Sequence, residues 1–360
     1  MADADLVRRL TQLRSKAVAR LLELGDPRAA MDGAQRNAAD ASRALGATDP
    51  ATVQARIDLL DALDLAGQVD DALELATSLS ESLAAERGGR DVEVLSVRHK
   101  LATVHYSMGH LPTAISIFEQ VRDDQIQLLG PAHPDTLTTM TALADVYESA
   151  GQVDDSLTLY REILDALEAL HGPNHAETFA VRINLAYALE SAERYDDAID
   201  AGEQLLADIS RVHGVNHPDA LTAMNNLAYA HESKGDFGIA VELYDRVLRF
   251  RNETLGRDHP ETFVSMNNLA FAYHEDGRTQ EALPIFLQVL RERERALSSS
   301  HPDTMLSAHN VAFAYSALGQ TQDAIALYKE VLAKRELLLG SDHPDTARTR
   351  RNLADLVDEE

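Results

Sequence analysis

Apolar and small residues return along this chain with a fixed period of 42 residues. Counting the first residue of each unit as position 0, a leucine or valine stands at position 10 and, in most units, an alanine at position 11. The position-10 residues are Leu59, Leu101, Leu143, Leu185, Leu227, Leu269, Val311 and Leu353. A small residue at position 23 and often an aromatic at position 27 complete the pattern. This spacing predicts two amphipathic helices in each unit.

Polar and glycine residues mark where these helices should begin and end. Most units open with a segment such as His-Pro-Asp-Thr at 133–136, in which proline and the acid suit the first turn of a helix. A glycine at position 18 should end the first helix in a left-handed conformation. These glycines are Gly25, Gly67, Gly109, Gly151, Gly235, Gly277 and Gly319, and Glu193 is the exception. A second glycine near position 39 should end the second helix.

Each unit is therefore predicted to be a helical hairpin that buries its apolar face only by stacking on its neighbours. The expected fold class is all-α: a right-handed α-solenoid of antiparallel helix–turn–helix repeats. We expect a single solenoid over 1–360, with a capping helix at 343–360. Its units start near residues 7, 49, 91, 133, 175, 217, 259 and 301. Residues 1–132 hold divergent units, and 133–354 hold the more regular ones.

The order of leucine, small residue, aromatic, glycine and alanine resembles the tetratricopeptide repeat (TPR) signature. The usual unit of that family has about 34 residues, so this one is longer. The longer unit, with Met224-Asn225-Asn226-Leu227-Ala228 and Leu255-Gly256-Arg257-Asp258-His259-Pro260, resembles the kinesin light chain group of TPR proteins. The resemblance implies a non-enzymatic protein that holds an extended peptide through asparagines in its groove.

The two faces of the first helix differ in character. At about 100° per residue, positions 7, 10, 11 and 14 share the packed face, whereas positions 5, 9, 12 and 16 should line the concave surface. Position 9 carries Asn184, Asn226, Asn268, Asn310 and Asn352, and position 12 carries Tyr187, Tyr229, Phe271 and Phe313. Asparagine can pair with a peptide backbone, and aromatics offer rigid apolar area. These residues are the predicted peptide-binding site, although they could also pack between repeats.

Charged residues extend the predicted site. Glu190 and Glu232 should face the groove, which favours a basic or amphipathic peptide. Arg348 and Arg351 lie near Asn352 in the last helix, where they either clamp a carboxylate of the partner or solvate the cap. The chain has 59 acidic and 33 basic residues, for a net charge of −26. This charge argues against nucleic acid and anionic lipid as partners, and it also keeps a long solenoid soluble.

Catalytic and metal signals are weak in the sequence. Cysteine and tryptophan are absent, which excludes thiol chemistry and fits a reducing cytoplasm. No phosphate loop, nucleophile elbow or zinc-binding helix motif occurs. Histidines at equivalent positions of stacked repeats should lie on the order of 10 Å apart, too far to share a metal. We therefore expect no enzyme activity, no cofactor and no metal.

Three functions remain open at this stage. The first is a cytoplasmic peptide- or protein-binding scaffold, with a monomer favoured and no nucleic acid or membrane as partner. The second is a regulatory sensor or receptor module of a bacterial-type signalling system, acting through a partner protein. The third is a self-assembling structural repeat protein.

Overall fold

The computed structural model describes residues 4–24 and 26–358, and these residues form seventeen helices and no strand. The first helices of the repeats are α1 (Ala4–Glu23), α3 (Pro50–Leu65), α5 (Val92–Ser107), α7 (Pro134–Ser149), α9 (Ala176–Ser191), α11 (Pro218–Lys234), α13 (Pro260–Glu275) and α15 (Pro302–Ala317). The second helices are α2 (Pro27–Leu45), α4 (Val69–Arg87), α6 (Leu111–Leu129), α8 (Val153–His171), α10 (Tyr195–His213), α12 (Phe237–Thr254), α14 (Thr279–Ala296) and α16 (Thr321–Leu339). The last helix is α17 (Pro344–Asp358). The all-α prediction is confirmed.

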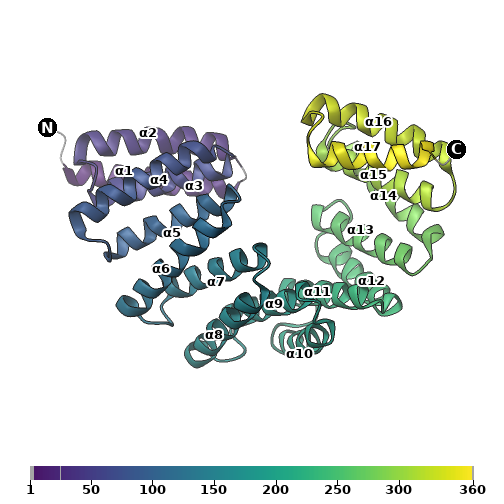
Figure 1. Cartoon of the computed structure of the whole chain (residues 1–360), viewed down its shortest axis with the longest axis horizontal. Coiled ribbons are helices and arrows are strands. Elements are labelled where there is room, and N and C mark those ends of the chain that lie inside the picture. Colours follow the sequence, from purple (N-terminus) through teal and green to yellow (C-terminus); the bar gives the residue numbers. More distant parts are fainter. Residues whose placement is uncertain (1–3, 25, 359–360) are drawn as a thin grey trace. The chain divides into compact units, whose positions relative to one another are not determined.

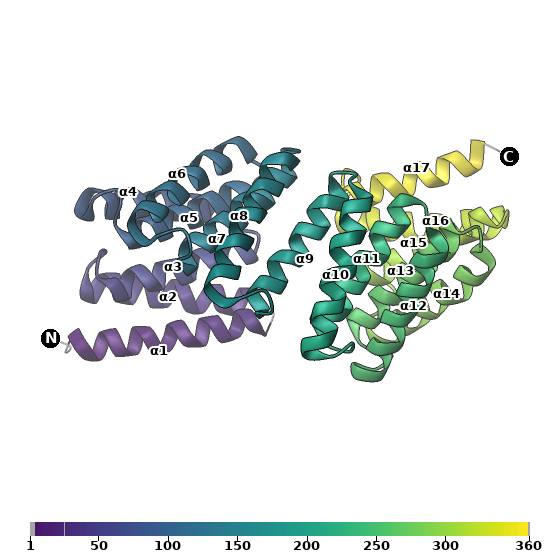
Figure 2. The same ribbon diagram turned by 90° about the horizontal axis from the view of Figure 1, so that it is seen from below.

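The chain divides into two compact units, each larger than a repeat: a first unit, Met1–Val181, and a second unit, Arg182–Glu360. Within each unit, consecutive helices run antiparallel and every hairpin stacks on the next (Figures 1 and 2). The core follows the predicted positions: Leu143, Leu227 and Val311 of the first helices are buried, as are Tyr160, Tyr244 and Phe286 of the second. Apolar burial between neighbouring hairpins therefore stabilises each stack.

The residue that opens each repeat caps the first helix. In α7, α11, α13 and α15, a histidine Nδ1 accepts a hydrogen bond from the backbone N–H two residues later. Asp49 and Asp91 do the same with a carboxylate at the start of α3 and α5. This bond satisfies one of the donors left free at a helix N-terminus. The recurrent histidines thus have a local structural task that the sequence analysis did not assign.

Helix ends follow the predicted glycines. Gly235 ends α11 with φ of 95° and ψ of 8°, in the left-handed region that residues with a Cβ rarely adopt. Glu193 takes φ of 58° at the equivalent place, so the repeat that begins at residue 175 accepts backbone strain there. Gly25 and residues 359–360 of the expected cap lie outside the described residues.

In the unit Arg182–Glu360, arginines of the second helices donate hydrogen bonds to the following repeat. The sequence analysis did not anticipate these bonds. Arg335 at the end of α16 is 1% exposed and donates to the backbone oxygen of Asp345 at 2.9 Å and to Thr349 Oγ1 at 2.6 Å, both in α17. Arg293 makes the same pair of bonds to Asp303 and Ser307. Arg251 also bonds the start of the next first helix. These bonds join each second helix to the following hairpin.

The 42-residue register leads to a prediction about deletion. Removing residues 217–258 takes out α11 and α12 as one hairpin, so α10 can stack on α13 through surfaces of the same kind. We expect a soluble protein that circular dichroism shows to be as helical per residue as the parent. Removing only residues 238–258 leaves α11 without its partner helix and should cause aggregation or partial unfolding. Equal behaviour of the two deletions would contradict the register.

Candidate functional site

The C-terminal compact unit, Arg182–Glu360, contains a groove where positions 9 and 12 of the first helices were predicted to lie. It encloses about 350 Å³. The lining side chains come from α9, α11, α12 and α13, and they are Tyr187, Asn225, Asn226, Tyr229, Glu232, Tyr244, Asn268 and Phe271. Positions 9 and 12 lie about one turn apart on each first helix, so stacking three such helices brings amides and rings to one surface.

Two of the four aromatic rings that line the groove are exposed to solvent. Tyr187 is 48% exposed and Tyr229 43%. Phe271 is half-buried, with its ring edge-on to Phe286 at 5.0 Å between centroids and 6.1 Å from Phe313. Rigid rings that gain contact area at little cost in side-chain entropy are typical of binding surfaces. The groove therefore offers apolar area for side chains of a partner.

Carboxylates give the groove a negative field. Glu232 is half-buried and accepts a hydrogen bond from the Tyr244 hydroxyl at 3.0 Å. Burial raises the pKa of Glu232 above its ordinary value, with the bond from Tyr244 acting in the opposite direction. Glu190 accepts from Ser233 Oγ at 2.7 Å. Chiefly through its charge, Glu190 also raises the pKa of Tyr229, because a second negative charge is disfavoured there.

The predicted asparagines fall into different environments. Asn226 and Asn268 line the groove, and Asn268 Nδ2 donates to Asn225 Oδ1 at 2.9 Å. Asn184 is half-buried on α9, and Asn310 is buried at 6% exposure. Asn352 Nδ2 donates to the Tyr328 hydroxyl at 3.3 Å. Two groove amides, those of Asn268 and Asn225, are thus paired with each other, and Asn310 presents little surface.

The remaining predicted residues do not line this groove. Phe313 is half-buried, and its ring meets His274 edge-on at 4.7 Å. Arg348 forms an ion pair with Asp345 at 2.8 Å on the same helix, and Arg351 is exposed on α17. The clamp by these arginines remains a prediction.

Sequence reasoning overlooked two lining residues. Asn225 precedes the predicted Asn226 in an Asn-Asn doublet that recurs at residues 267–268. Tyr244 occupies position 27, to which the sequence analysis gave no place in the groove, and its hydroxyl reaches Glu232. The doublet was visible in the sequence. The reach of the hydroxyl depends on how α12 crosses α11, which the repeat pattern does not specify.

The family model for the tetratricopeptide repeat matches residues 93–169, 143–208, 193–253, 219–295 and 303–359. The chain therefore belongs to the tetratricopeptide repeat family, whose members are scaffolds for protein–protein interaction. None of the described helices combines the length and apolarity needed to cross a bilayer.

Several solved structures are similar to this chain. A protein from Podospora anserina with nearly identical TPR-like repeats of the kinesin light chain type is 31% identical, with a TM-score of 0.52 over 57% of this chain and 96% of that one. A Rap protein complexed with Competence and Sporulation Factor is 10% identical, with a TM-score of 0.50 over 98% of each chain. A Signal Transduction ATPase with Numerous Domains from Pyrococcus horikoshii, with a TPR sensor, is 12% identical; its TM-score is 0.59 over 94% of this chain and 48% of that one. The last two share the fold alone, and no curated protein matches the chain.

Proposed function

We propose that this protein is a non-enzymatic scaffold that binds an extended peptide segment in the groove of its second unit. The observation that carries the proposal is the set of side chains around the 350 Å³ groove: exposed tyrosines, asparagine amides and a half-buried glutamate. Amides can pair with peptide N–H and C=O groups, and the rings can hold alternate side chains. Its occupant would be a segment of another cytoplasmic protein, bound by a monomer of this chain.

The charge of the groove favours a basic residue in that segment. Glu190 disfavours the phenolate of Tyr229, and the same field stabilises a lysine or arginine brought to this position. Such a cation could also stack on the Tyr187 or Tyr229 ring, which adds about 0.5–2 kcal/mol in typical sites. We therefore infer a peptide with a cationic side chain flanked by apolar ones.

A sensor role is the alternative proposal. The fold of this chain is similar to that of the TPR sensor in the Pyrococcus horikoshii protein, at 12% identity. In that case the same groove would receive the signal and a partner protein would supply the output. A self-assembling role is a third proposal, which light scattering at rising concentration tests directly.

Selection from a displayed library of random peptides tests the binding proposal. The full chain is the bait, and each enriched peptide is afterwards tested against the Tyr229→Ala variant, with no counter-selection. We expect enriched peptides to share a lysine or arginine next to apolar residues and to lose affinity for the Tyr229→Ala variant. Enrichment of acidic peptides, or of peptides that bind the parent chain and the variant equally, would overturn the proposal.

The raised pKa of Glu232 sets the expected pH dependence. As pH falls through that raised range, Glu232 takes up a proton and loses the charge that attracts a cation, so affinity for a selected basic peptide should fall. The Glu232→Gln variant should bind roughly five- to tenfold more weakly at pH 7 and should lose most of the pH dependence seen below neutral pH. Isothermal titration calorimetry measures both.

Glu203 on α10 is exposed and does not line the groove, so Glu203→Gln is the matched control. It should keep the parent affinity and the parent pH profile. If Glu232→Gln retained the full pH dependence, another group would have to account for it.

A further inference from the structure

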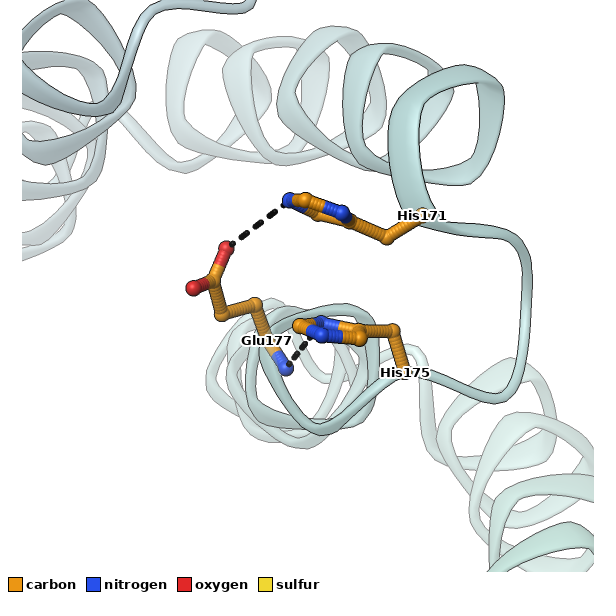
Figure 3. Close-up of side chains that lie close together, drawn as sticks. All are labelled: His171, His175 and Glu177. Atoms are coloured by element: carbon orange, nitrogen blue, oxygen red, sulfur yellow. Dashed lines mark hydrogen bonds and ion pairs between the residues drawn. The ribbon is translucent and has the colours of Figure 1, made fainter.

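The linker between α8 and α9 brings three possible metal ligands together. His171 is the last residue of α8, His175 lies in the linker, and Glu177 belongs to the first turn of α9 (Figure 3). One ligand atom from each lies within 4.8 Å of the others, and all three residues are exposed. His171 Nε2 is 3.6 Å from Glu177 Oε2. The described part of the chain holds no other group of three such residues this close.

The repeat pattern itself does not require His171. Its position, four residues before a repeat start, is occupied by leucine in most of the later units: Leu129, Leu255, Leu297 and Leu339. His175 has the capping role described above, with its Nδ1 accepting from the Glu177 N–H. That bond is 3.4 Å long, whereas the other capping histidines make it at 3.2 or 3.3 Å. His171 is thus not part of the repeat pattern, whereas His175 also caps α9.

The three ligand atoms lie close to the spacing that a tetrahedral ion requires. The two imidazole rings are stacked, with centroids 4.3 Å apart and planes 22° from parallel. In a tetrahedral Zn²⁺ site with bonds near 2.0–2.1 Å, neighbouring ligand atoms lie about 3.3 Å apart. Because the ring planes are nearly parallel, their in-plane lone pairs are nearly parallel too. Binding one ion therefore requires one exposed imidazole to turn about its side-chain torsions and His175 Nδ1 to leave its bond to the Glu177 N–H. The open side leaves room for water as the fourth ligand.

A second linker supplies an internal comparison. His213 and His217 are also stacked, with centroids 4.6 Å apart and planes at 26°. There the acid is Asp219, one methylene shorter, and its carboxylate lies 3.6 Å from Nδ1 of His217. This linker has the same two histidines with a shorter carboxylate, which isolates the contribution of Glu177.

We propose that His171, His175 and Glu177 form a site for one divalent transition-metal ion of the Zn²⁺ class. His171 supplies Nε2, His175 supplies the Nδ1 lone pair that now accepts from the backbone, and Glu177 supplies a carboxylate oxygen. Two neutral imidazoles and one carboxylate suit an ion of intermediate softness. The ion joins the end of α8 to the first turn of α9 and so fixes the intervening linker residues 172–174. Sequence reasoning compared histidines of successive repeats and did not consider two histidines of one linker.

Metal titration of the untagged, chelator-treated chain tests the site. Isothermal titration calorimetry with ZnCl₂ should show one saturable site. Titration with Co²⁺ should give a visible absorption band typical of a low-coordinate nitrogen and oxygen site. His171→Leu introduces the residue of the other repeats and should weaken Zn²⁺ binding at least about thirtyfold, since one of three ligands is lost. Glu177→Asp reproduces the His213–His217–Asp219 linker and should therefore remove saturable binding over the concentration range in which the parent saturates.

Control variants in the linker between α10 and α11 separate loss of a metal ligand from other effects. His213→Leu should leave the affinity unchanged, and Asp219→Glu should create a second site, so that two equivalents bind. Melting temperature in EDTA should be the same for the parent and His171→Leu, which separates loss of a ligand from loss of fold. The proposal is overturned if the parent shows no saturable binding at 100 μM, if His171→Leu binds like the parent, or if His171→Leu and His213→Leu each remove one of two equal sites.

Discussion

Replacing Arg335 by alanine should lower the free energy of unfolding of the C-terminal hairpin by about 2–4 kcal/mol. The Arg335 side chain is 1% exposed and bonds both a backbone oxygen and a hydroxyl of α17. Alanine removes both charge-assisted bonds and leaves a cavity at the interface between α16 and α17. Each effect alone is of the order of 1–3 kcal/mol in buried sites.

Hydrogen exchange measures this effect where it should occur. Because each hairpin contacts only its neighbours, protection should be lost in α15, α16 and α17 and should be retained in α11. Arg335→Met keeps most of the side-chain volume without the desolvation cost of the charge, so it should lose less stability than alanine. Equal protection of α17 in the parent and in Arg335→Ala would contradict the proposed role of this side chain.

His309 provides a second readout of the same variant. Its imidazole lies 3.3 Å from Thr349 Oγ1, and its pKa is lowered to about 4 by burial first and by the Arg335 charge second. Removing that charge should raise the pKa of His309, which NMR titration of the imidazole protons detects. A change of packing that kept the guanidinium in place would not have this effect.

Much of the fold could be predicted because it depends on a repeated pattern. Leucine at position 10 and alanine at position 11 specify the packed face of each first helix, and glycine at position 18 specifies where it ends. The first helices from α3 to α17 begin 42 residues apart, as at Pro50, Val92, Pro134 and Ala176. Because the pattern recurs in eight repeats, one exception such as Glu193 does not hide it.

Interactions that join two repeats were harder to predict. An arginine stands at position 34 in three consecutive units, as Arg251, Arg293 and Arg335. Its partner is a serine or threonine at position 6 of the next unit, such as Ser307. Both patterns were present in the sequence, but an arginine near a helix end ordinarily indicates a solvated surface. The burial of the arginine at position 34 becomes clear only from the way the second helix packs against the next first helix.

The sequence indicated which residues lie on the groove side, but it did not indicate which of them form hydrogen bonds with one another. Helical periodicity placed Tyr187, Tyr229 and Phe271 on the groove side, and the structure has them there. Periodicity cannot show which amides bond one another, because the bond between Asn268 and Asn225 depends on the spacing of α11 and α13. It also cannot show that Asn310 is covered by its neighbours.

Replacing both Asn226 and Asn268 by alanine should have the largest effect on peptide binding. If these amides pair with the peptide backbone, each loss leaves a buried group unpaired and costs about 1–3 kcal/mol. The double variant should therefore bind a selected basic peptide at least about thirtyfold more weakly when the two sites act independently. Tyr229→Ala and Phe271→Ala should also weaken binding, with some added loss of stability for Phe271, which is half-buried.

Asn216→Ala is the control, since Asn216 is exposed in a linker and does not line the groove. The central measurement is the melting temperature and the peptide affinity of Asn226→Ala, determined side by side with this control. Binding in the groove predicts an affinity at least about fivefold lower with a melting temperature within about 2 °C of the parent. A clear fall in melting temperature with unchanged affinity would show that the asparagines hold the repeats together and that the peptide site lies elsewhere.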